Sequence, residues 1–592
     1  MTIQFDLFKK EIADFLQKGI EYLYQKYSLH HTTQRDEILP LLTVPPEFHF
    51  GQCAFPCFPF AKKLKLPPQK IALELQDEFS RFPKKYIQKV DAVQGYLNFY
   101  CDFQNISVHM WECIQNYDFF KSNFYEKEEL EKIVVEYSQP NTHKAMHVGH
   151  LRCLVLGDAV SNLLEFVGHK IVRATYPGDV GAHVAKLIWY ITHPTPKKLP
   201  SENFVPWLGE MYAKSDEEIK KIKGSESEIE MKKEFSEILK QISAQRGSYY
   251  ELWKLTREWS LNYLKDIYTW LHSHFDVWYF ESECDEPSKK LVQKKLEEGF
   301  FIQDHGAIGL DLTEYKLGFA MFLKSDGHGL YLTKDLELLD LKFQDKEVTK
   351  SIYVVDSRQK FHFEQLFKTA ELLGYKQAKK SHHLAYETVN TEDGVPFSSR
   401  ALNGLGLFEL KNKMEKKVMD DYLLRYRGQW SEREMELTAK NVSMSALKYG
   451  MLKVDNNTSI TFSLSEWLRL DGETGPYLLY VHARCCSILE KQKEFLKEVV
   501  SFDYLELIEK ELVFALWQFH QNVFASAQNY RPSILCSYLF DLCKKFNRFY
   551  ENCPIKNAAD HEKFARLAIV AMTQKVLEKG LQLLGIPAVE KM

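Results

Sequence analysis

The sequence feature with the clearest chemical meaning is the run His147-Val148-Gly149-His150. It lies where a helical pattern of apolar residues begins, after a predicted buried strand and a loop. The N-terminus of a helix offers unpaired N–H groups and the positive end of the helix dipole, and imidazole rings add further donors. Gly149 would let a flat base approach the backbone. The four-residue pattern alone is weak, but its position makes it a strong candidate for binding phosphate.

The elements that must position this run form the beginning of a parallel α/β sheet. A buried strand at 132–136, a helix at 147–168 and a second strand at 171–175 follow one another closely, and this order is typical of such a sheet. Another buried strand at 351–355 precedes a helix at 361–373. The sequence therefore predicts a parallel-sheet domain in the middle of the chain.

The segments before, within and after this sheet predict different architectures. Apolar residues at helical spacing in 3–27 predict a helix, and alternation over 93–100 predicts a strand. Residues 205–272 are charged and helical, which predicts an insertion with a solvated face rather than a binding tail. Short segments at 301–322, in which apolar and polar residues alternate, indicate hairpins. From about residue 406 onward the pattern is helical almost throughout.

The composition excludes several classes of protein. The 592 residues carry 77 Lys and Arg against 81 Asp and Glu, a net charge of −4, so a uniformly basic nucleic-acid coat is excluded. With 14% aromatic residues and only 27 glycines, the chain is neither disordered nor fibrous. Eleven cysteines without a Cys-x-x-Cys pair predict reduced, mostly buried thiols. Because neither a signal peptide nor a long apolar run is visible, we expect a cytoplasmic protein that spans no membrane.

The wider run VEYSQPNTHKAMHVGHLRCLVLGDAVSNLLEFVGH resembles class I aminoacyl-tRNA synthetases, and arginyl-tRNA synthetases in particular. Further segments agree in order along essentially the whole chain. They are GDVGAHVAKL at 178–187, YLTKD at 331–335, VVDSRQKFHFEQLF at 354–367, GPYLLYVHAR at 475–484 and the final LGIPAVEKM. Six ordered matches make coincidence improbable.

The resemblance implies a three-part fold. We expect an α/β catalytic domain of the Rossmann type, with a parallel sheet and a helical insertion, at 113–405. The insertion is expected at about 190–272. An α+β N-terminal domain at 1–112 would contact the tRNA, and an all-α anticodon-binding bundle would occupy 406–592.

The resemblance also implies a pocket for free arginine. The five rigid donors of a guanidinium pair best with planar carboxylates. In the family an aspartate, matched here by Asp335, holds the guanidinium, and a glutamate, matched by Glu281, assists it. The other residues that match the pocket are Glu136, Asn141, Tyr331 and Gln359, the last of which would hold the backbone end of the ligand.

The second class I signature, Lys-Met-Ser-Lys-Ser, has lost both lysines here. The corresponding stretch is Pro396-Phe-Ser-Ser-Arg400, yet the charge on the leaving phosphates must be countered. Many arginine enzymes carry a lysine just before the histidine motif instead, and Lys144 matches it. The expected ATP site therefore comprises Lys144, His147, Gly149, His150, Ser398, Ser399 and Arg400. Mg²⁺ is expected to arrive with ATP, without a dedicated protein metal site.

The resemblance places tRNA contacts at both ends of the chain. Phe50 and Gln52 match family residues that touch the D-loop of the tRNA. Tyrosine faces and arginine guanidinium planes can stack on unpaired bases. In the bundle the matching residues are Tyr480, Arg484, Tyr550 and Met592, whereas Pro554 falls where some relatives have an aromatic residue.

The implied activity is ATP-dependent ligation of L-arginine to tRNA(Arg), by a protein expected to be a monomer. Two alternatives stay open. Another class I synthetase is disfavoured by the acidic pocket, which does not suit apolar substrates. An inactive paralogue kept for RNA binding is suggested by the missing signature lysines, but the histidine motif and the pocket residues are present.

Overall fold

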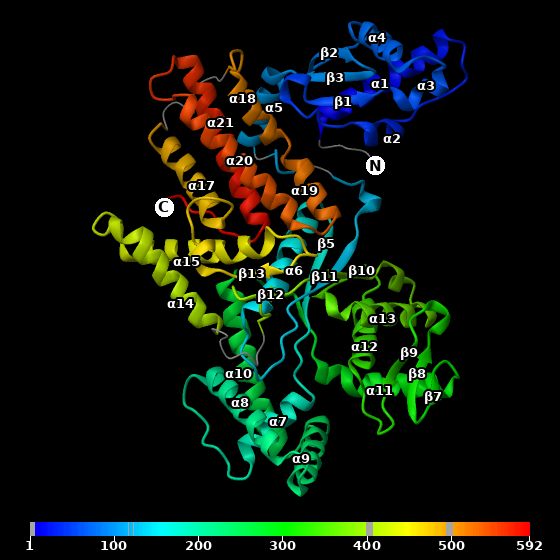
Figure 1. Cartoon of the computed structure of the whole chain (residues 1–592), viewed down its shortest axis with the longest axis vertical. Coiled ribbons are helices and arrows are strands. Elements are labelled where there is room, and N and C mark those ends of the chain that lie inside the picture. Colours follow the sequence, from blue (N-terminus) through cyan, green and yellow to red (C-terminus); the bar gives the residue numbers. More distant parts are fainter. Residues whose placement is uncertain (1–5, 117, 122–123, 398–405, 493–500) are drawn as a thin grey trace.

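The computed structural model describes residues 6–116, 118–121, 124–397, 406–492 and 501–592. Three parts follow one another along the chain, and the helical bundle packs against the central part (Figure 1). The N-terminal part lies beside the helical bundle, and the insertion projects at the opposite end of the molecule (Figure 1). The central part therefore adjoins the helical bundle at one end and carries the insertion at the other.

The N-terminal part is a small α+β unit. Its three-stranded antiparallel sheet has the order β1-β3-β2, and its strands and main helices are α1 (Leu7–Lys26), α2 (Arg35–Ile38), β1 (Cys53–Pro56), α3 (Phe58–Leu64), α4 (Pro68–Phe79), β2 (Ile87–Val93) and β3 (Tyr96–Cys101). The strand predicted at 93–100 is observed as β3, but it begins only at Tyr96, because Gln94 and Gly95, with φ of 50° and 87°, form the turn between β2 and β3. Such positive φ angles are typical of two-residue hairpin turns.

Helix α5 (Phe103–Gln115) runs across residue 112, where the sequence analysis placed the first boundary. It contacts helices of the C-terminal bundle rather than ending the N-terminal unit. The exact division between the first two domains stays a prediction.

The central sheet contains five parallel strands in the order β11-β10-β4-β5-β6, which confirms the predicted Rossmann-type core. Its strands are β4 (Lys132–Glu136), β5 (Lys170–Thr175), β6 (Val277–Trp278), β10 (Val348–Asp356) and β11 (His382–Tyr386). Its principal helices are α6 (Val148–Phe166), α7 (Ala182–Thr192), α11 (Glu281–Glu297), α12 (Tyr331–Phe343) and α13 (Lys360–Leu372). The apolar run in β4 is buried on both faces, as parallel strands require.

The strand order fixes where ligands can bind. After β4 the chain continues to β5 and β6 on one side, and then returns to β10 and β11 on the other. Loops that leave the carboxyl ends of β4 and β10 therefore diverge and open a crevice, the usual ligand site in such sheets. The segment from Tyr137 to His147 leaves β4 at this point.

Two additions interrupt the central part. The helical insertion comprises α8 (Phe204–Ile222), α9 (Glu226–Ser243) and α10 (Ser248–Trp270). The hairpins predicted at 301–322 are confirmed by an antiparallel sheet of β7 (Ile302–Asp304), β8 (Ala307–Asp311) and β9 (Phe319–Leu323). The insertion is not solvated all round, because its helices bury apolar residues against α7.

The C-terminal part is a helical bundle, as predicted. Its main helices are α14 (Leu407–Val418), α15 (Glu432–Leu452), α17 (Gly475–Glu490), α18 (Leu507–Trp517), α19 (Phe519–Gln528), α20 (Pro532–Asn552) and α21 (Asp560–Leu583), with a short α16 (Leu464–Trp467). One short strand, β13 (Ile460–Thr461), pairs with β12 (Val389–Asn390) of the central part.

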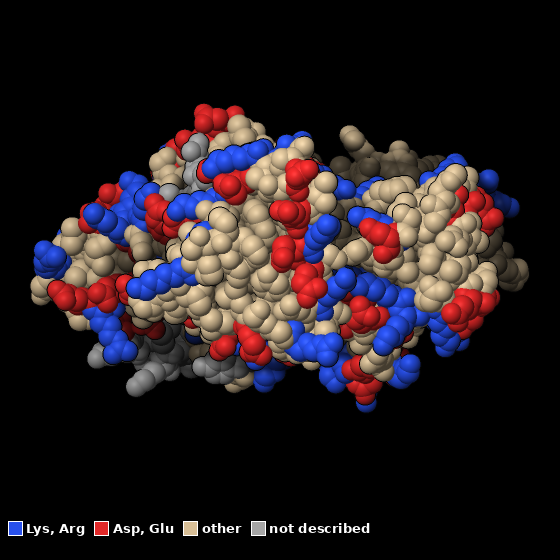
Figure 2. Space-filling model, turned by 90° about the horizontal axis from the view of Figure 1, so that it is seen from below, with Lys and Arg blue, Asp and Glu red and all other residues tan. Residues whose placement is uncertain are grey.

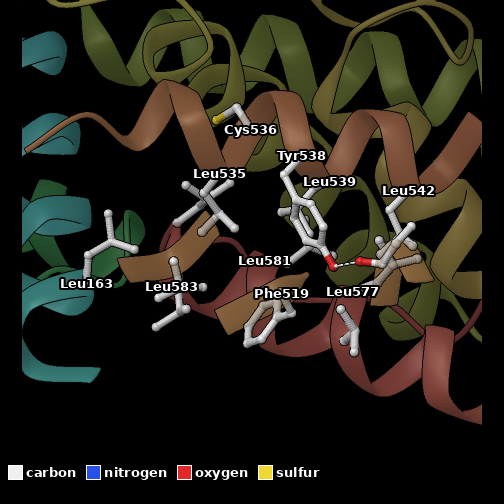
Figure 3. Close-up of a cluster of buried hydrophobic side chains, with 14 of the residues drawn as sticks. Leu163, Phe519, Leu535, Cys536, Tyr538, Leu539, Leu542, Leu577, Leu581 and Leu583 are labelled. Atoms are coloured by element: carbon white, nitrogen blue, oxygen red, sulfur yellow. Dashed lines mark hydrogen bonds between the residues drawn. The ribbon is translucent and has the colours of Figure 1, made fainter. Parts of the chain in front are cut away.

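The bundle and the central part share one apolar core. Figure 3 shows Leu163 of α6 beside apolar side chains of α20 and α21, among them Leu535 and Leu583. Tyr538 on α20 donates a hydrogen bond to the Ala515 carbonyl at 3.0 Å in the same cluster (Figure 3). Helix α6 carries the histidine motif at its N-terminus, so the bundle directly supports this part of the candidate active site.

The surface carries both charge signs. Seen from the insertion end, acidic and basic side chains are interspersed and neither sign covers the face (Figure 2). This distribution agrees with the small net charge of −4. Among the described residues, no helix is both long and apolar enough to span a bilayer.

Candidate active site

The histidine motif caps helix α6 in a reciprocal arrangement. The N–H of Gly149 donates to His147 Nδ1, and the N–H of His147 donates to His150 Nδ1, both at 3.1 Å. Burial lowers the pKa of His147 to about 4 and that of His150 to about 3, so both rings are neutral at pH 7. A neutral imidazole whose Nδ1 accepts carries its proton on Nε2. Each ring therefore offers an Nε2–H donor at the start of the helix.

Gly149 is required by this close packing. A side chain there would begin 2.9 Å from His147 Cε1 and 3.6 Å from Phe397 Cβ. Phe397 belongs to the degenerate second signature, so the structure brings the two signatures together at the start of α6. The predicted ATP residues Ser398, Ser399 and Arg400 follow directly and lie outside the described residues.

The positive charge at this site comes from lysines rather than from the histidines. Lys144 precedes the motif. Burial lowers the pKa of His150 and of His183 on α7 most, and the charge of Lys144 lowers both pKa values further. Lys186 lies on α7 and bonds Asp216 of the insertion at 2.6 Å. A helix N-terminus, two neutral donors and the Lys144 cation together suit a polyphosphate.

Glu281 and Asn141 converge on a second point at the same sheet edge. A side chain at Gly178 would meet Asn141 Oδ1 at 2.5 Å and Glu281 Oε1 at 3.3 Å, so only glycine leaves room there. The other oxygen of Glu281 pairs with Lys334 Nζ at 2.9 Å. Burial raises the pKa of Glu281 to about 7 in spite of this pair. Asn141 and Glu281, predicted from separate segments, thus meet beside Gly178, at a place that is called the recess below.

Helix α12 adds the next predicted residues to this recess. Tyr331 is 68% exposed at its first turn, and Asp335 lies one turn further along. Asp335 Oδ2 lies 2.6 Å from His362 Nε2 on α13, which leaves Oδ1 available to a ligand. Gln359, just before α13, is exposed at the end of the loop that leaves β10. The carboxylates at 281 and 335 can therefore both accept from a guanidinium.

Glu136, which the resemblance predicts at the arginine site, is buried at the end of β4. It is 3% exposed and forms an ion pair with Lys342, a fully buried side chain. Its other oxygen accepts from the Gln139 amide at 3.1 Å. Because a charge taken out of water needs a partner, this pair holds the base of the crevice together. In this structure Glu136 does not present a free carboxylate.

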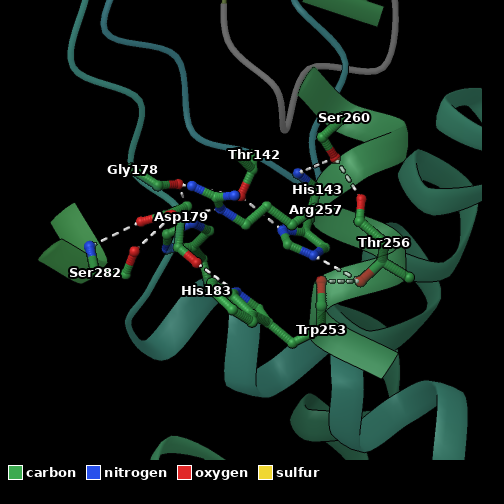
Figure 4. Close-up of polar contacts among 10 residues, drawn as sticks. All are labelled: Thr142, His143, Gly178, Asp179, His183, Trp253, Thr256, Arg257, Ser260 and Ser282. Carbon is green, nitrogen blue, oxygen red and sulfur yellow. Dashed lines mark hydrogen bonds and ion pairs between the residues drawn. The ribbon is translucent and has the colours of Figure 1, made fainter. Parts of the chain in front are cut away.

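A buried network ties the insertion to the recess (Figure 4). Asp179, fully buried, accepts from Arg257 Nε at 2.6 Å and from the N–H and hydroxyl of Ser282 at 2.9 and 2.8 Å. Its carbonyl accepts from the Trp253 indole at 2.8 Å. His143, with φ of 66°, bonds Thr256 of the same insertion helix at 2.9 Å. The insertion is therefore anchored beside both the histidine motif and Glu281.

Comparison with known families agrees with this arrangement. The model described as "tRNA synthetases class I (R), catalytic domain" matches residues 117–464. The models described as "Arginyl tRNA synthetase N terminal domain" and "DALR anticodon binding domain" match 6–101 and 478–592. A Bdellovibrio bacteriovorus protein named arginine–tRNA ligase is 41% identical over 592 residues, all of both chains. The chain belongs to the arginyl-tRNA synthetase family.

Other members of the family agree over the full length. The arginine–tRNA ligase of Clostridioides difficile is 31% identical and covers 99% of this chain and 100% of its own. The solved Thermus thermophilus arginyl-tRNA synthetase is 25% identical, with a TM-score of 0.78, and covers 98% of this chain and 99% of its own. A Plasmodium falciparum structure, 22% identical with the same TM-score, supports the fold alone.

The residues predicted to contact an anticodon line one cavity in the bundle. This cavity, of about 940 Å³, is bordered by Tyr480, Arg484, Tyr550 and Met592, and also by Pro554. The Arg484 guanidinium lies 4.7 Å from the Tyr480 ring centroid and 5.0 Å from that of Tyr550. It also donates to the Tyr480 hydroxyl at 2.7 Å. A cation held between two aromatic rings is preorganised to contact unstacked bases and phosphate.

The two predicted contacts in the N-terminal unit differ in exposure. Phe50 is 39% exposed at the surface, where it can meet a partner. Gln52 is 4% exposed, and its amide bonds the Phe48 carbonyl at 3.2 Å and the Cys101 N–H at 3.0 Å. Gln52 therefore fixes the loop that presents Phe50.

Sequence reasoning missed several residues of the site. The missed residues His362, Lys334 and Asp179 lie within segments that carry the family resemblance. Each acts through a partner that is distant in sequence, namely Asp335, Glu281 and Arg257 respectively. The segment GDVGAH was a signal that could have pointed to Asp179. Asp216 of the insertion, the partner of Lys186, carried no such signal.

Proposed function

We propose that this protein ligates L-arginine to tRNA(Arg) in two steps. A carboxylate oxygen of arginine attacks the α-phosphorus of ATP, the bond to the β-phosphate oxygen breaks, and pyrophosphate leaves. The 2′-hydroxyl of the terminal adenosine then attacks the arginyl carbonyl carbon, and AMP leaves. The observation that carries this proposal is the acidic recess beside the histidine-capped N-terminus of α6, in a chain of this family.

The phosphates of ATP are assigned to the start of α6. His147 and His150 would donate through Nε2, and Lys144 would supply charge that the second signature lacks. Mg²⁺ would enter with ATP and share that charge. Ser398 and Arg400 remain predictions for the same site. None of these groups forms a covalent intermediate, so positioning and electrostatic stabilisation account for the rate.

Arginine is assigned to the recess between α11 and α12. Asp335 and Glu281 would accept from the guanidinium, with Tyr331 beside them. Asn141 and Gln359 would hold the α-amino and carboxylate end, nearer the phosphates. Glu136 supports the base of the recess through Lys342.

The tRNA is assigned to two surfaces. The cavity around Arg484 would take anticodon bases, and Phe50 would contact the D-loop. The domain limits 1–112, 113–405 and 406–592, the action as a monomer and the location in the cytoplasm remain predictions.

Arginine-dependent exchange of pyrophosphate into ATP, with and without matching tRNA, tests the activity. We expect exchange with arginine and none with lysine or cysteine. The exchange with arginine should be faster with tRNA than without it, or should require tRNA. Exchange with a different amino acid would identify another class I synthetase. A folded protein that binds tRNA without any exchange would instead be an RNA-binding paralogue.

A further inference from the structure

The insertion places one aromatic side chain beside the lysines of the phosphate site. Tyr212 lies on α8, and its ring centroid is 4.4 Å from Lys144 Nζ and 3.5 Å from Lys186 Nζ. Burial raises the pKa of the Tyr212 phenol, but hydrogen bonds to these two lysines outweigh burial and lower that pKa below its ordinary value. The Tyr212 ring therefore lies against two cations.

The two lysines differ in their other partners. Lys186 is 9% exposed and bonds Asp216, which lies one turn along α8 from Tyr212. In the part of the chain that the structure describes, no carboxylate forms an ion pair with Lys144. Among the described residues the Lys144 cation is therefore held by the Tyr212 ring without being neutralised, which suits a group that must meet phosphate.

Tyr212 also has an electrostatic effect on Tyr331, one of the predicted arginine-binding residues. Burial and Glu281 raise the pKa of Tyr331 most, and Tyr212 adds to the same shift. The side chain of Tyr212 on α8 thus contacts Lys144 before α6 and also influences the ionisation of Tyr331 on α12. The charge that develops on the leaving pyrophosphate lies on the side of the α-phosphorus away from the attacking carboxylate, where Lys144 is proposed to act.

A lysine needs such support more than an arginine does. Its flexible four-carbon stem loses conformational freedom whenever the ammonium is fixed in one place. An aromatic ring attracts the ammonium without cancelling its charge, because the interaction is with the ring quadrupole. A carboxylate at the same place would compete with phosphate for the cation.

We propose that Tyr212 is a positioning residue that holds Lys144 for the leaving pyrophosphate, so that the helical insertion takes part in arginine activation. The inference rests on the proposed role of Lys144. It gives the insertion a function beyond the solvated face that its charge pattern suggests.

A double-mutant cycle in pyrophosphate exchange tests the inference. The variants are Tyr212→Leu, Tyr212→Phe, Lys144→Ala and the double variant Tyr212→Leu/Lys144→Ala, assayed with tRNA. Tyr212→Leu should lower the kcat of exchange about tenfold or more, with the arginine KM nearly unchanged. Tyr212→Phe, which keeps the ring, should recover part of that loss. In the Lys144→Ala background, Tyr212→Leu should have no further effect, because the group it positions is gone.

The control is Tyr250→Leu, which removes a tyrosine of the same insertion whose ring lies 5.5 Å from Lys254, an exposed lysine outside the site. It should leave exchange unchanged. If Lys144→Ala leaves exchange intact, the proposed role of Lys144 is wrong. If Lys144→Ala lowers exchange but Tyr212→Leu does not, or if the two losses multiply in the double variant, the positioning role of Tyr212 is overturned. Thermal unfolding of each variant separates these outcomes from loss of folding.

Discussion

At the residue scale, one carboxylate proposed to bind arginine is already paired with a cation before any substrate binds. Glu281 shares one oxygen with Lys334, while the other faces Gly178 and Asn141. One oxygen of the Glu281 carboxylate is therefore paired, and the other is left to accept from a ligand. Such an arrangement prevents the cost of an unpaired buried carboxylate and still leaves a position for a guanidinium.

The ionisation of Glu281 predicts a pH dependence of arginine binding. Burial raises its pKa to about 7, helped by Asp335 and Asp179, so the free carboxylate is charged above that pH and protonated below it. A protonated carboxyl binds a guanidinium weakly. The arginine KM in exchange should therefore rise as the pH falls below 7, by at most about tenfold per pH unit, whereas the ATP KM should change little.

The variant Glu281→Gln provides the comparison for this prediction. It cannot ionise, so its arginine KM should be high at every pH and should lack the rise on acidification. A wild-type arginine KM that stays flat across the neutral range would show that Glu281 does not meet the substrate.

At the element scale, the packing of helix α6 depends on a close contact with Tyr137, the residue that follows β4. Gly157 lies where α6 crosses Tyr137, and a side chain there would begin 2.2 Å from Tyr137 Cγ. Both residues are buried, so neither can move without disturbing the core. The position of the histidine motif at the start of α6 follows from this contact.

Gly157→Ala should accordingly destabilise the protein. We expect the free energy of unfolding to fall by about 1–3 kcal/mol, the usual effect of overpacking a core, as measured by urea unfolding. The matched control is Gly209→Ala on α8, where nothing lies within 4 Å of the added methyl group. That change should be neutral or stabilise by up to about 1 kcal/mol, because alanine is a better helix former than glycine. Equal effects at both positions would contradict the packing argument.

The elements that could be predicted from sequence are those with a local signal. Buried strands such as β4 appear as apolar runs, and α6 has a helical period with a glycine after it. The turn at Gln94 was missed because apolar alternation continues through it. The contact between Tyr212 and Lys144 was missed because it joins two helices distant in sequence, and no local pattern records such a pairing. For the same reason the match at Glu136 could not reveal its ion pair.

At the scale of the whole molecule, Arg152 joins the central part to the bundle. It is 1% exposed, and among the described residues its guanidinium donates to five backbone carbonyls, at 2.6–3.4 Å, those of Glu387, Thr388, Asp455, Asn456 and Thr458. The first two lie after the last strand of the sheet and the other three lie in the bundle. One buried cation on α6 therefore holds both sides of the junction.

Arg152→Leu should weaken this junction strongly. It leaves several buried carbonyls without donors, and we expect the free energy of unfolding to fall by about 3 kcal/mol or more. Urea unfolding gives the measurement. Arg469→Leu is the control, because Arg469 is half exposed and pairs with Asp471 at the surface; its effect should stay within about 0.5 kcal/mol. A small effect at Arg152 would show that the two parts do not depend on it.

The core shared by α6, α20 and α21 limits how this protein can change over time. Leu163 and its neighbours in the bundle fill one volume, so a larger side chain on one helix requires a smaller one on another. The anticodon-reading part therefore cannot be exchanged for that of another synthetase by recombination alone. Compensating substitutions along α6 would have to accompany any such exchange, and they would fall on the helix that begins with the histidine motif.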